Sequence, residues 1–531
     1  MDTKIQKERL TLPIGYQTFA NLRKEGCYYV DKTPLIREMI QRGRFYFLSR
    51  PRRFGKSLLV STLKELFEGN EPLFQGLDIH PHWDWLVQYP VVRLTLDGKV
   101  STPESLEKNI VNQLRGIESR FGLTSLPPLT EAADRLRNLL DHLHQKTARQ
   151  VVVLVDEYDK PVLDVLEDDE KARANRDSLR EIYSIIKSSE DHIRFVFVTG
   201  ITMFSKTSFS SGLNNLTDIS LYPRYATICG YTDHDLDTVF APELEGLDRD
   251  KIRTWYNGYN WLGEEKLYNP HDILHLFDMR EFRAHWFKSG EPGYLYRLLK
   301  ENRVSSMQLE NRVVDADFVT NFELGEFSHE ALLFQSGYLT ITKKEFDEDN
   351  ILYHLDYPNY EVQRSFNAGL AEHLTKRGRE IAKTGNALIQ ALGENHFSVF
   401  KQKIQAMLEG IPYAWPSSGD LGHYEAWYAS LLYMSFRTTP VDLKAEEMTS
   451  HGRSDLVILH QNQVFVLELK MVKGSKNMER KVEKGLNEAI MQIREHGYAE
   501  KYRDLDQPIH LIGMVFGEKK RNLLDIRVEK L

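Results

Sequence analysis

Four short, almost entirely apolar runs separated by segments of helical spacing constrain the fold of this chain most strongly. The runs are Phe45–Leu48, Val91–Leu96, Val151–Val155 and Ile193–Val198. A run such as Val-Val-Val-Leu-Val leaves no polar face for solvent, so the strand it forms must be buried on both sides. Such strands alternate with helices in parallel sheets that have helices on both faces. We therefore predict an α/β fold with a parallel sheet for the first half of the chain.

The first apolar run leads into Arg50-Pro-Arg-Arg-Phe-Gly-Lys-Ser57, and Lys56–Phe67 then has helical spacing. A strand, a loop and a Gly-Lys-Ser that opens a helix are typical of a nucleotide P-loop. Lys56 would reach the β- and γ-phosphates of ATP, and Ser57 would bind Mg²⁺. The usual first glycine of the motif is Arg50 here, and an L-residue disfavours a positive φ. The predicted nucleotide-binding residues of the loop are Arg52, Arg53, Phe54, Gly55, Lys56 and Ser57.

Two carboxylates end the third apolar run and complete the predicted ATPase site. Asp156 is predicted to hold Mg²⁺ and Glu157 to polarise the attacking water. The next strand ends at Thr199, whose hydroxyl would sense the γ-phosphate, although a simple strand cap explains it equally well. Arg224 is a candidate arginine finger for a neighbouring subunit, so homo-oligomerisation through this domain stays open. A solvated surface arginine is the simpler interpretation of Arg224.

A second group of chemically competent residues lies near the other end of the chain. Glu468 and Lys470 are two positions apart in an apolar strand, so both side chains face the same way. Asp455 lies in the preceding strand, across a short hairpin. Two carboxylates that share Mg²⁺ or Mn²⁺ beside an amine are typical of a metal-dependent nuclease. An ordinary Glu–Lys pair on an edge strand remains the alternative. Glu425 and Gln492, on flanking helices, are predicted accessory residues, although a solvated helix face explains Glu425 equally well and a role outside the site is as good an explanation of Gln492.

Length and composition bound the class of protein. A chain of 531 residues is too long for one ordinary core, so two to four domains are expected. The formal charge of −8 argues against a wholly basic nucleic-acid coat protein but allows a local basic groove. Only two cysteines occur, which excludes a disulfide framework and a zinc cluster. The N-terminus lacks the apolar core of a signal peptide, and no apolar run is long enough to span a bilayer. We expect a cytoplasmic protein without membrane contact.

The middle of the chain is mostly helical and contains one hairpin signal. Tyr338–Thr342 and Ile351–Leu355 are predicted strands on either side of a polar turn. A helix followed by a hairpin is compatible with a winged-helix module, and a generic connecting domain is equally compatible. The predicted domains are a P-loop ATPase over 1–255, a helical middle over 256–378, and an α/β nuclease-like domain with a helical lead-in over 379–531.

Motifs spread over nearly the whole chain resemble the bacterial AAA-ATPase-like family that carries a C-terminal PD-(D/E)XK nuclease domain. The motifs are Leu12–Ala20, Tyr28–Ile36, Ser49–Ser57, Trp255–Tyr259, Tyr268–Pro270 and Pro358–Val362. The resemblance implies that arginine is tolerated at the start of the P-loop. It also implies that Asp455, Glu468 and Lys470 form the nuclease core, with Glu425 and Gln492 as accessory positions. Asp31 and Lys32 are candidates for contact with the nucleotide base or ribose.

These observations predict an ATP-binding and ATP-hydrolysing protein with a Mg²⁺-dependent nuclease domain under nucleotide control. The expected partner is nucleic acid, with DNA favoured over RNA. One alternative is an ATP-dependent signalling or defence switch with a nuclease effector. Another is a nucleic-acid-binding ATPase whose nuclease fold is inactive.

Overall fold

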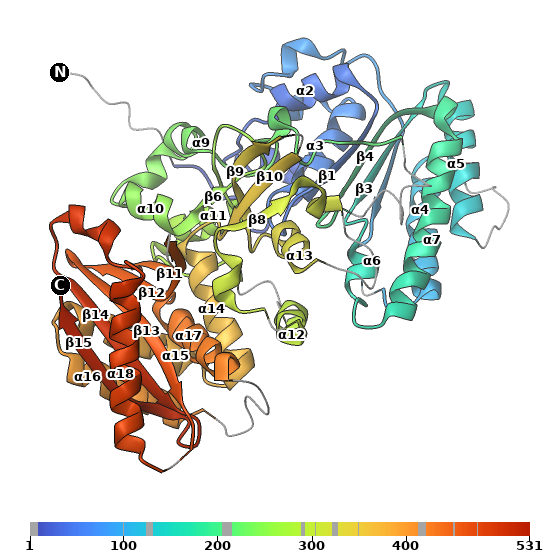
Figure 1. Ribbon diagram of the computed structural model, residues 1–531. Helices are drawn as coiled ribbons and strands as arrows, with labels where there is room; N and C mark the ends of the chain where they lie inside the picture. The colour runs from blue at the N-terminus through green and yellow to red at the C-terminus, as the bar shows by residue number, and fades with distance from the viewer. Residues whose placement is uncertain are drawn as a thin grey trace, which may run out of the picture. The chain divides into compact units, whose positions relative to one another are not determined.

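The computed structural model describes residues 9–98, 100–123, 131–203, 215–287, 293–302, 304–320, 328–348, 350–411, 421–449, 452–474 and 476–531. The chain forms two compact units, each built from two stretches of sequence. The first comprises Met1–Glu291 and Val313–Asn359, and the second comprises Pro292–Arg312 and Tyr360–Leu531 (Figure 1). The three-domain division of the sequence analysis stays a prediction. None of the helices in the described ranges is long and apolar enough to cross a membrane.

A five-stranded parallel sheet forms the centre of the first unit. Its strands are β1 (Phe45–Ser49), β2 (Val91–Thr95), β3 (Val151–Asp156), β4 (Ile193–Gly200) and β5 (Thr217–Asp218). They lie in the order β2-β3-β4-β1-β5, and every neighbouring pair is parallel. All residues of β1 and β3 are buried, as their apolar sequences require. The four strands expected from the apolar runs are therefore confirmed.

Helices cover both faces of this sheet. Helix α3 (Lys56–Phe67) follows β1 and crosses the sheet toward β2. Helices α4 (Pro103–Arg120), α5 (Ala132–Thr147) and α7 (Asp169–Ser188) lie in connections that run the opposite way, from β2 to β3 to β4. Because such crossovers are right-handed, the reversal puts these helices on the face opposite α3. Figure 1 shows α4, α5 and α7 together on one side of the sheet, away from α3.

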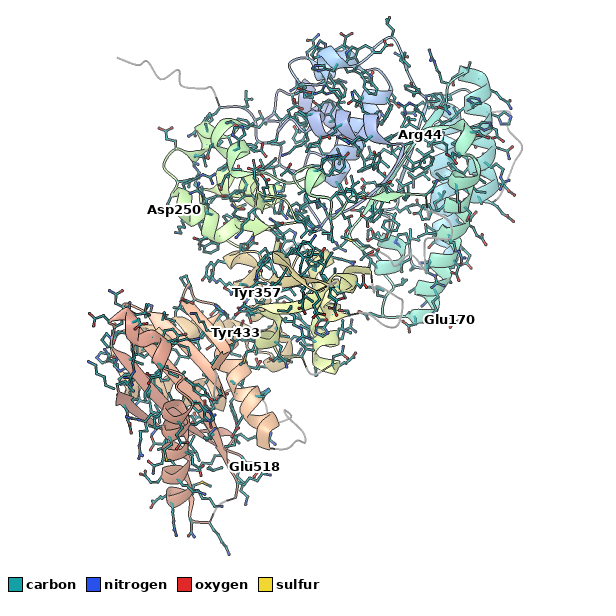
Figure 2. The ribbon with its side chains drawn as sticks, turned by 45° about the horizontal axis from the view of Figure 1, so that its top comes forward. Arg44, Glu170, Asp250, Tyr357, Tyr433 and Glu518 are labelled. Carbon is teal, nitrogen blue, oxygen red and sulfur yellow. The ribbon has the colours of Figure 1, made fainter. Side chains whose placement is uncertain are left out.

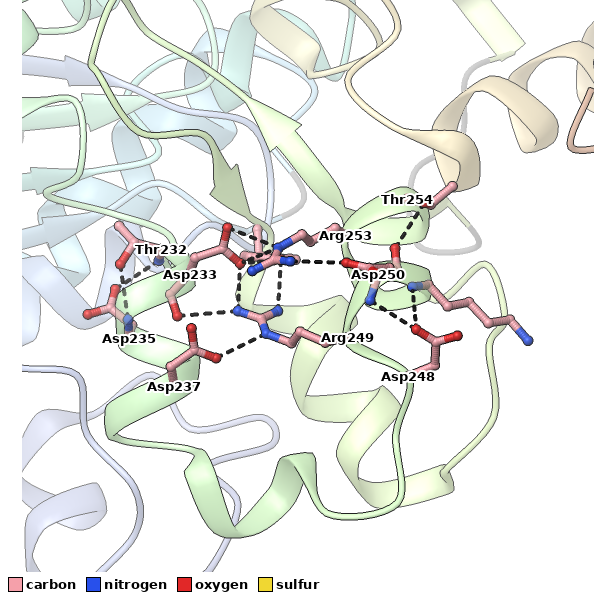
Figure 3. A network of polar contacts seen from close by, with 11 residues as sticks. Thr232, Asp233, Asp235, Asp237, Asp248, Arg249, Asp250, Arg253 and Thr254 are labelled. Carbon is pink, nitrogen blue, oxygen red and sulfur yellow. Dashed lines mark hydrogen bonds and ion pairs between the residues drawn. The ribbon is translucent and has the colours of Figure 1, made fainter. Parts of the chain in front are cut away.

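A helical layer follows the sheet within the first unit. It contains α9 (Asp233–Thr238), α10 (Arg249–Tyr256) and α11 (Pro270–Met279), and its core includes Tyr28 and Val30, which lie before α2 (Thr33–Arg42). Asp233 joins α9 to α10, because its carboxylate lies 2.5 Å from Arg249 and 3.4 Å from Arg253 (Figure 3). These ion pairs link the two short helices.

The hairpin predicted for the middle of the chain is present and longer than expected. Strands β9 (Thr340–Asp347) and β10 (Asn350–Asp356) pair antiparallel, and β8 (Arg312–Asp315) lies beside β10. Helix α13 (His329–Ser336) precedes them and ends at Gly337, which has a φ of 90°. The polar turn between the two strands, expected over Phe346–Asn350, is shorter than that, because Phe346 and Asp347 belong to β9 and Asn350 begins β10. The winged-helix interpretation stays a prediction.

The second unit is built on a mixed five-stranded sheet. Its strands are β11 (Asp442–Thr449), β12 (Gly452–His460), β13 (Gln463–Val472), β14 (Ile509–Gly517) and β15 (Asn522–Lys530), in that order. Only β13 and β14 are parallel, and the other pairs are antiparallel. The helices are α12 (Gly293–Glu301), α14 (Tyr360–Thr375), α15 (Gly378–Gly393), α16 (Phe397–Glu409), α17 (Leu421–Phe436) and α18 (Met478–Glu495). The predicted α/β class is confirmed for this end of the chain.

Helices α17 and α18 lie on opposite faces of this sheet. Gly485 of α18 packs against Val515 of β14. The next residue, Phe516, stacks on Tyr428 of α17 with ring centroids 4.4 Å apart. Successive residues of a strand point to opposite faces, so the two helices sandwich the sheet.

The segment between β13 and β14 is not one continuous helix. Helix α18 ends at Glu495, and a separate 3-10 turn covers Glu500–Leu505. Gly497, with a φ of 61°, lies between them in the left-handed region, which no α-helix continues through.

Candidate functional site

The chain turns from β1 into α3 through two residues with left-handed backbone. They are Arg53, with a φ of 65°, and Gly55, with a φ of 95°, which caps α3. Gly55 has no Cβ to oppose this conformation, whereas Arg53 adopts it at a steric cost. Arg50 is not among the residues with positive φ, so the loop needs no glycine at its first position.

Arg50 serves a structural purpose that its position in the motif did not reveal. Its guanidinium is 0% exposed and stacks on Trp261 at 4.2 Å. It donates hydrogen bonds to the carbonyl oxygens of Ser49, Ser220, Tyr225 and Ala226 at 2.8–3.3 Å. Burial lowers the pKa of Arg50 to about 10, so the group stays charged at neutral pH. Arg50 therefore anchors the start of the loop through buried contacts.

Residues that come after the parallel sheet in the sequence contact Pro51, Arg52 and Phe54 of the loop. The Arg52 carbonyl accepts from the Trp286 indole at 3.0 Å and from the Asn269 amide at 3.4 Å. Phe54 is buried against two aromatic rings, those of Tyr259 and Trp261, with centroids 4.8 and 5.1 Å away. A Cβ on Gly337 would lie 2.8 Å from the ring of Pro51. We call Tyr259, Trp261, Asn269, Trp286 and Gly337 the loop clamp.

Lys56, Ser57 and Asp156 lie together, as the sequence predicts. The Lys56 ammonium is buried and donates to the carbonyl oxygens of Arg50 at 2.9 Å and Pro51 at 3.0 Å. Burial lowers its pKa, although the nearby carboxylates oppose that shift. Asp156 is also buried, which raises its pKa, while a hydrogen bond with Ser57 lowers it. One Asp156 oxygen is buried without a hydrogen-bond partner. A carboxylate oxygen and a hydroxyl in this arrangement fit Mg²⁺.

The two other predicted residues of this site have different surroundings. Glu157 is half-buried, has a φ of 56°, and lines the cavity described below. Burial raises its pKa, which suits a proton acceptor. The Thr199 hydroxyl is fully buried and donates to the Leu48 carbonyl at 2.9 Å. It therefore joins β4 to β1. Arg224, the candidate finger, pairs with Glu38 of its own chain at 3.3 Å.

Asp159 belongs to this group, although the sequence analysis did not select it. It is fully buried, and one oxygen accepts from the Ile201 and Thr202 amides and from the Thr202 hydroxyl at 2.6–2.9 Å. Its other oxygen is buried and has no hydrogen-bond partner. Burial raises the pKa of Asp159, and Lys56 lowers it. The only signal in the sequence was its place three residues after Asp156.

A cavity of about 660 Å³, a size that fits a nucleotide, is lined by some of these residues but not by Asp156 or Thr199. Lys56, Ser57, Glu157 and Asp159 lie on its phosphate-loop side, and Arg52, Arg53, Phe54 and Gly55 also line it. Ile14–Gln17, Tyr28–Val30 and α11 form other walls. Lys32 lines the cavity and pairs with Asp235 at 2.9 Å. Asp31 instead accepts from the Thr33 and Asp78 amides at 2.8 Å, so it fastens the start of α2.

The second unit brings Glu425, Asp455, Glu468 and Lys470 together where β12 and β13 separate. Asp455 accepts from the Leu469 amide, and Glu425 accepts from the Met471 amide, each at 2.8 Å. The Lys470 ammonium lies 2.9 Å from one oxygen of Glu468. Three carboxylates from α17, β12 and β13 thus surround one stretch of β13.

The electrostatics of this cluster favour a cation. Glu468 is 2% exposed, and its second oxygen is buried without a hydrogen-bond partner. Burial and the neighbouring Asp455 raise the pKa of Glu468 to about 8. Burial alone would lower the pKa of Lys470, but the surrounding carboxylates outweigh it and raise the pKa.

The residues of the second unit fit Mg²⁺ as a partly hydrated ion. Among the described residues, no cluster of three or more His, Cys, Asp or Glu side chains is arranged to hold a metal. Mg²⁺ is commonly held by one or two carboxylates together with waters and substrate phosphates. Asp455 and Glu468 supply those two carboxylates. Gln492 lies on α18, where its amide lies 3.4 Å from the Tyr498 hydroxyl, so its predicted role at the cluster stays a prediction.

Comparisons with known proteins identify the domains in which the two groups of residues lie. Residues 13–210 match the family model described as "Predicted AAA-ATPase", and residues 423–526 match that of the PD-(D/E)XK nuclease superfamily. The chain is 44% identical over 527 residues to the protein named "Uncharacterized protein in vnfD 5'region" of Azotobacter chroococcum mcd 1. That similarity covers 98% of this chain and 99% of the relative. No solved structure matches the chain significantly.

Proposed function

Because the chain belongs to the bacterial family of predicted AAA-ATPases that carry a PD-(D/E)XK nuclease domain, we propose that it is a nucleotide-controlled nuclease. The first unit binds and hydrolyses ATP with Mg²⁺. The second cuts phosphodiesters of nucleic acid, DNA being the favoured substrate, with Mg²⁺ or Mn²⁺. The proposal places the protein in the cytoplasm, where both of its buried cysteines stay reduced.

The arrangement of Glu468 carries the nuclease part of the proposal. One oxygen of Glu468 is buried without a hydrogen-bond partner, Asp455 lies beside it, and the Lys470 ammonium is 2.9 Å from its other oxygen. Burying these charged groups is costly unless they bind a cation and a phosphate. A bound Mg²⁺ would polarise the phosphate and lower the pKa of a water molecule. Lys470 would then orient that water or stabilise the charge that develops on the phosphate. Glu425 holds β13 in place through the Met471 amide.

The first unit supplies the matching groups for ATP. The amides of the loop and of the α3 N-terminus would hold phosphate oxygens, with Lys56 between the β- and γ-phosphates. Ser57 and Asp156 would hold Mg²⁺. Glu157, whose pKa burial raises, would accept a proton from the attacking water.

Nucleotide control is supported by the contacts of the P-loop. Lys56 bonds to the carbonyl oxygens of Arg50 and Pro51, so turning it toward a phosphate disturbs that part of the loop. The loop clamp contacts the same part, with Gly337 at Pro51 and Trp286 at Arg52. The chain enters the second unit at Pro292, soon after Trp286, and again at Tyr360, after the β9–β10 hairpin. Movement of the loop therefore has a short covalent route to the second unit.

The test is cleavage of plasmid, linear duplex DNA, single-stranded DNA and RNA with Mg²⁺, with and without ATP. We expect cleavage that depends on ATP. Asp455→Ala and Glu468→Gln should each reduce it by more than the roughly 100-fold that loss of an outer-shell metal partner costs, without affecting ATP hydrolysis. Lys56→Ala should abolish hydrolysis. The exposed residues Glu488 and Lys108 provide the matched controls Glu488→Gln and Lys108→Ala.

Cleavage that persists in the Asp455→Ala, Glu468→Ala double variant would rule out the assigned nuclease site. ATP hydrolysis without cleavage of any substrate would instead favour a switch that awaits an activator, or a nuclease fold used only for binding.

A further inference from the structure

Two segments that are distant in sequence begin side by side at one edge of the C-terminal sheet. Strands β13 and β14 are parallel, and Val472 at the end of one pairs with Gly517 at the end of the other. The Glu518 amide also donates to the Val472 carbonyl at 3.1 Å. The segments that follow the two strands, residues 473–474 with 476–481 and residues 518–521, therefore leave the sheet from the same edge.

Both segments are strongly basic. Six exposed cations occur on them, and we call these the basic edge: Lys473, Lys476, Arg480, Lys481, Lys519 and Lys520. The only acids among the described residues of the two segments are Glu479 and Glu518. Figure 2 labels Glu518 at this end of the second unit. The whole chain has a formal charge of −8, so the basic edge reverses the prevailing sign locally.

The basic edge continues from the predicted nuclease cluster. Lys470 and Lys473 lie on the same chain, three residues apart, a span of about 10 Å in extended backbone. Duplex DNA carries one negative charge per roughly 1.7 Å of helix axis, so a backbone held at the cluster has many phosphates within that reach. Because the Asp455 carboxylate repels phosphate and Lys470 already pairs with Glu468, a further source of positive charge nearby is needed to hold the strand.

We propose that the basic edge binds the phosphodiester backbone of the nucleic acid beside the bond that is cut. This proposal rests on the proposed nuclease function and adds the surface that holds its substrate. The contacts are with phosphates, so they give affinity without sequence preference. Lys481 also donates to the Lys473 carbonyl at 2.8 Å, which fixes the first turn of α18 against the loop.

The test measures binding, so it does not depend on cleavage. The full-length Glu468→Gln protein is titrated with labelled duplex DNA, single-stranded DNA and RNA of equal length over a range of NaCl concentrations. Three further variants are made in the same background. They are Lys473→Gln with Lys476→Gln, Lys519→Gln with Lys520→Gln, and the combination of all four. The control is Arg379→Gln with Lys383→Gln, two exposed cations of α15 in the same unit.

The slope of log K against log salt is negative. Replacing each basic-edge pair should reduce its magnitude by up to about 1.8 for duplex DNA, or about 1.4 for a single strand. The combined variant should lower it by up to twice as much, and the α15 control should leave it unchanged. A combined variant with the parent slope, or a control that matches it, overturns the proposal. So does a parent protein that binds none of the three nucleic acids at low salt. If binding follows the expected pattern but the wild-type protein cleaves none of the substrates, the binding surface is retained and the nuclease function is rejected.

Discussion

Replacing Glu468 by glutamine should stabilise the protein at high pH while it removes nuclease activity. Burial and Asp455 raise the pKa of Glu468 from 4.5 to about 8. A pKa difference of one corresponds to about 1.4 kcal/mol. The rise from 4.5 to about 8 therefore means that ionising this carboxylate in the folded state costs about 5 kcal/mol at most. In the unfolded chain the same group ionises freely above its ordinary pKa.

The direction of the pH effect on stability follows from the linkage between protonation and folding. A carboxyl whose pKa is raised by folding contributes stability below its unfolded pKa of 4.5, and that contribution is lost as the pH rises through about 8. Wild type should thus lose stability between pH 6 and pH 9 through this group, whereas Glu468→Gln should not. Because relaxation and water penetration lower the cost of a buried charge in a real protein, the net gain at pH 9 should be smaller than this upper bound, about 1–3 kcal/mol.

Thermal unfolding of the full chain at pH 6 and pH 9, with and without Mg²⁺, measures this difference. For a unit of this size 1 kcal/mol moves the midpoint by about 2–4 °C. The variant should exceed wild type by roughly 2–12 °C at pH 9 and by clearly less at pH 6, where Glu468 is still protonated in the folded protein. Mg²⁺ should narrow the gap by stabilising wild type alone. Glu488→Gln, an exposed acid on α18, should change nothing. A Glu468→Gln protein that is no more stable than wild type at pH 9 would refute the reasoning.

Three further outcomes test the first unit. Arg50→Gly, which restores the usual glycine of the motif, should destabilise the protein by roughly 3–5 kcal/mol, because buried carbonyls lose their donor; urea unfolding measures this, and unchanged stability would contradict the anchoring role. Gly337→Val should weaken ATP binding about tenfold, since its Cβ meets Pro51 and its φ is 90°; calorimetric titration with ATP that gives the wild-type affinity would count against the loop clamp. Asp159→Asn should keep nucleotide binding and slow hydrolysis about tenfold or more, and a wild-type hydrolysis rate would exclude Asp159 from the site.

The sequence by itself determined the parts whose chemistry is local. The P-loop lies in eight consecutive residues, and Asp156 directly ends its own apolar strand. Glu468 and Lys470 share a strand, and Asp455 lies one hairpin away, so their proximity follows from backbone geometry over a short span. The buried strands were predictable for the same reason, because a continuous apolar run excludes a solvent-facing side.

Only the tertiary structure decided which distant groups meet. Arg50 interrupts the motif in the sequence, yet contacts with Ser220 and Trp261 show that it anchors the loop. Thr199 has the right place in the chain for a phosphate sensor, and only the structure shows that its hydroxyl donates to the Leu48 carbonyl of β1. The basic edge exists because the parallel pairing of β13 with β14 brings two loops together. Such contacts depend on packing between segments tens to hundreds of residues apart, a relation that periodicity and spacing along one strand or helix do not encode.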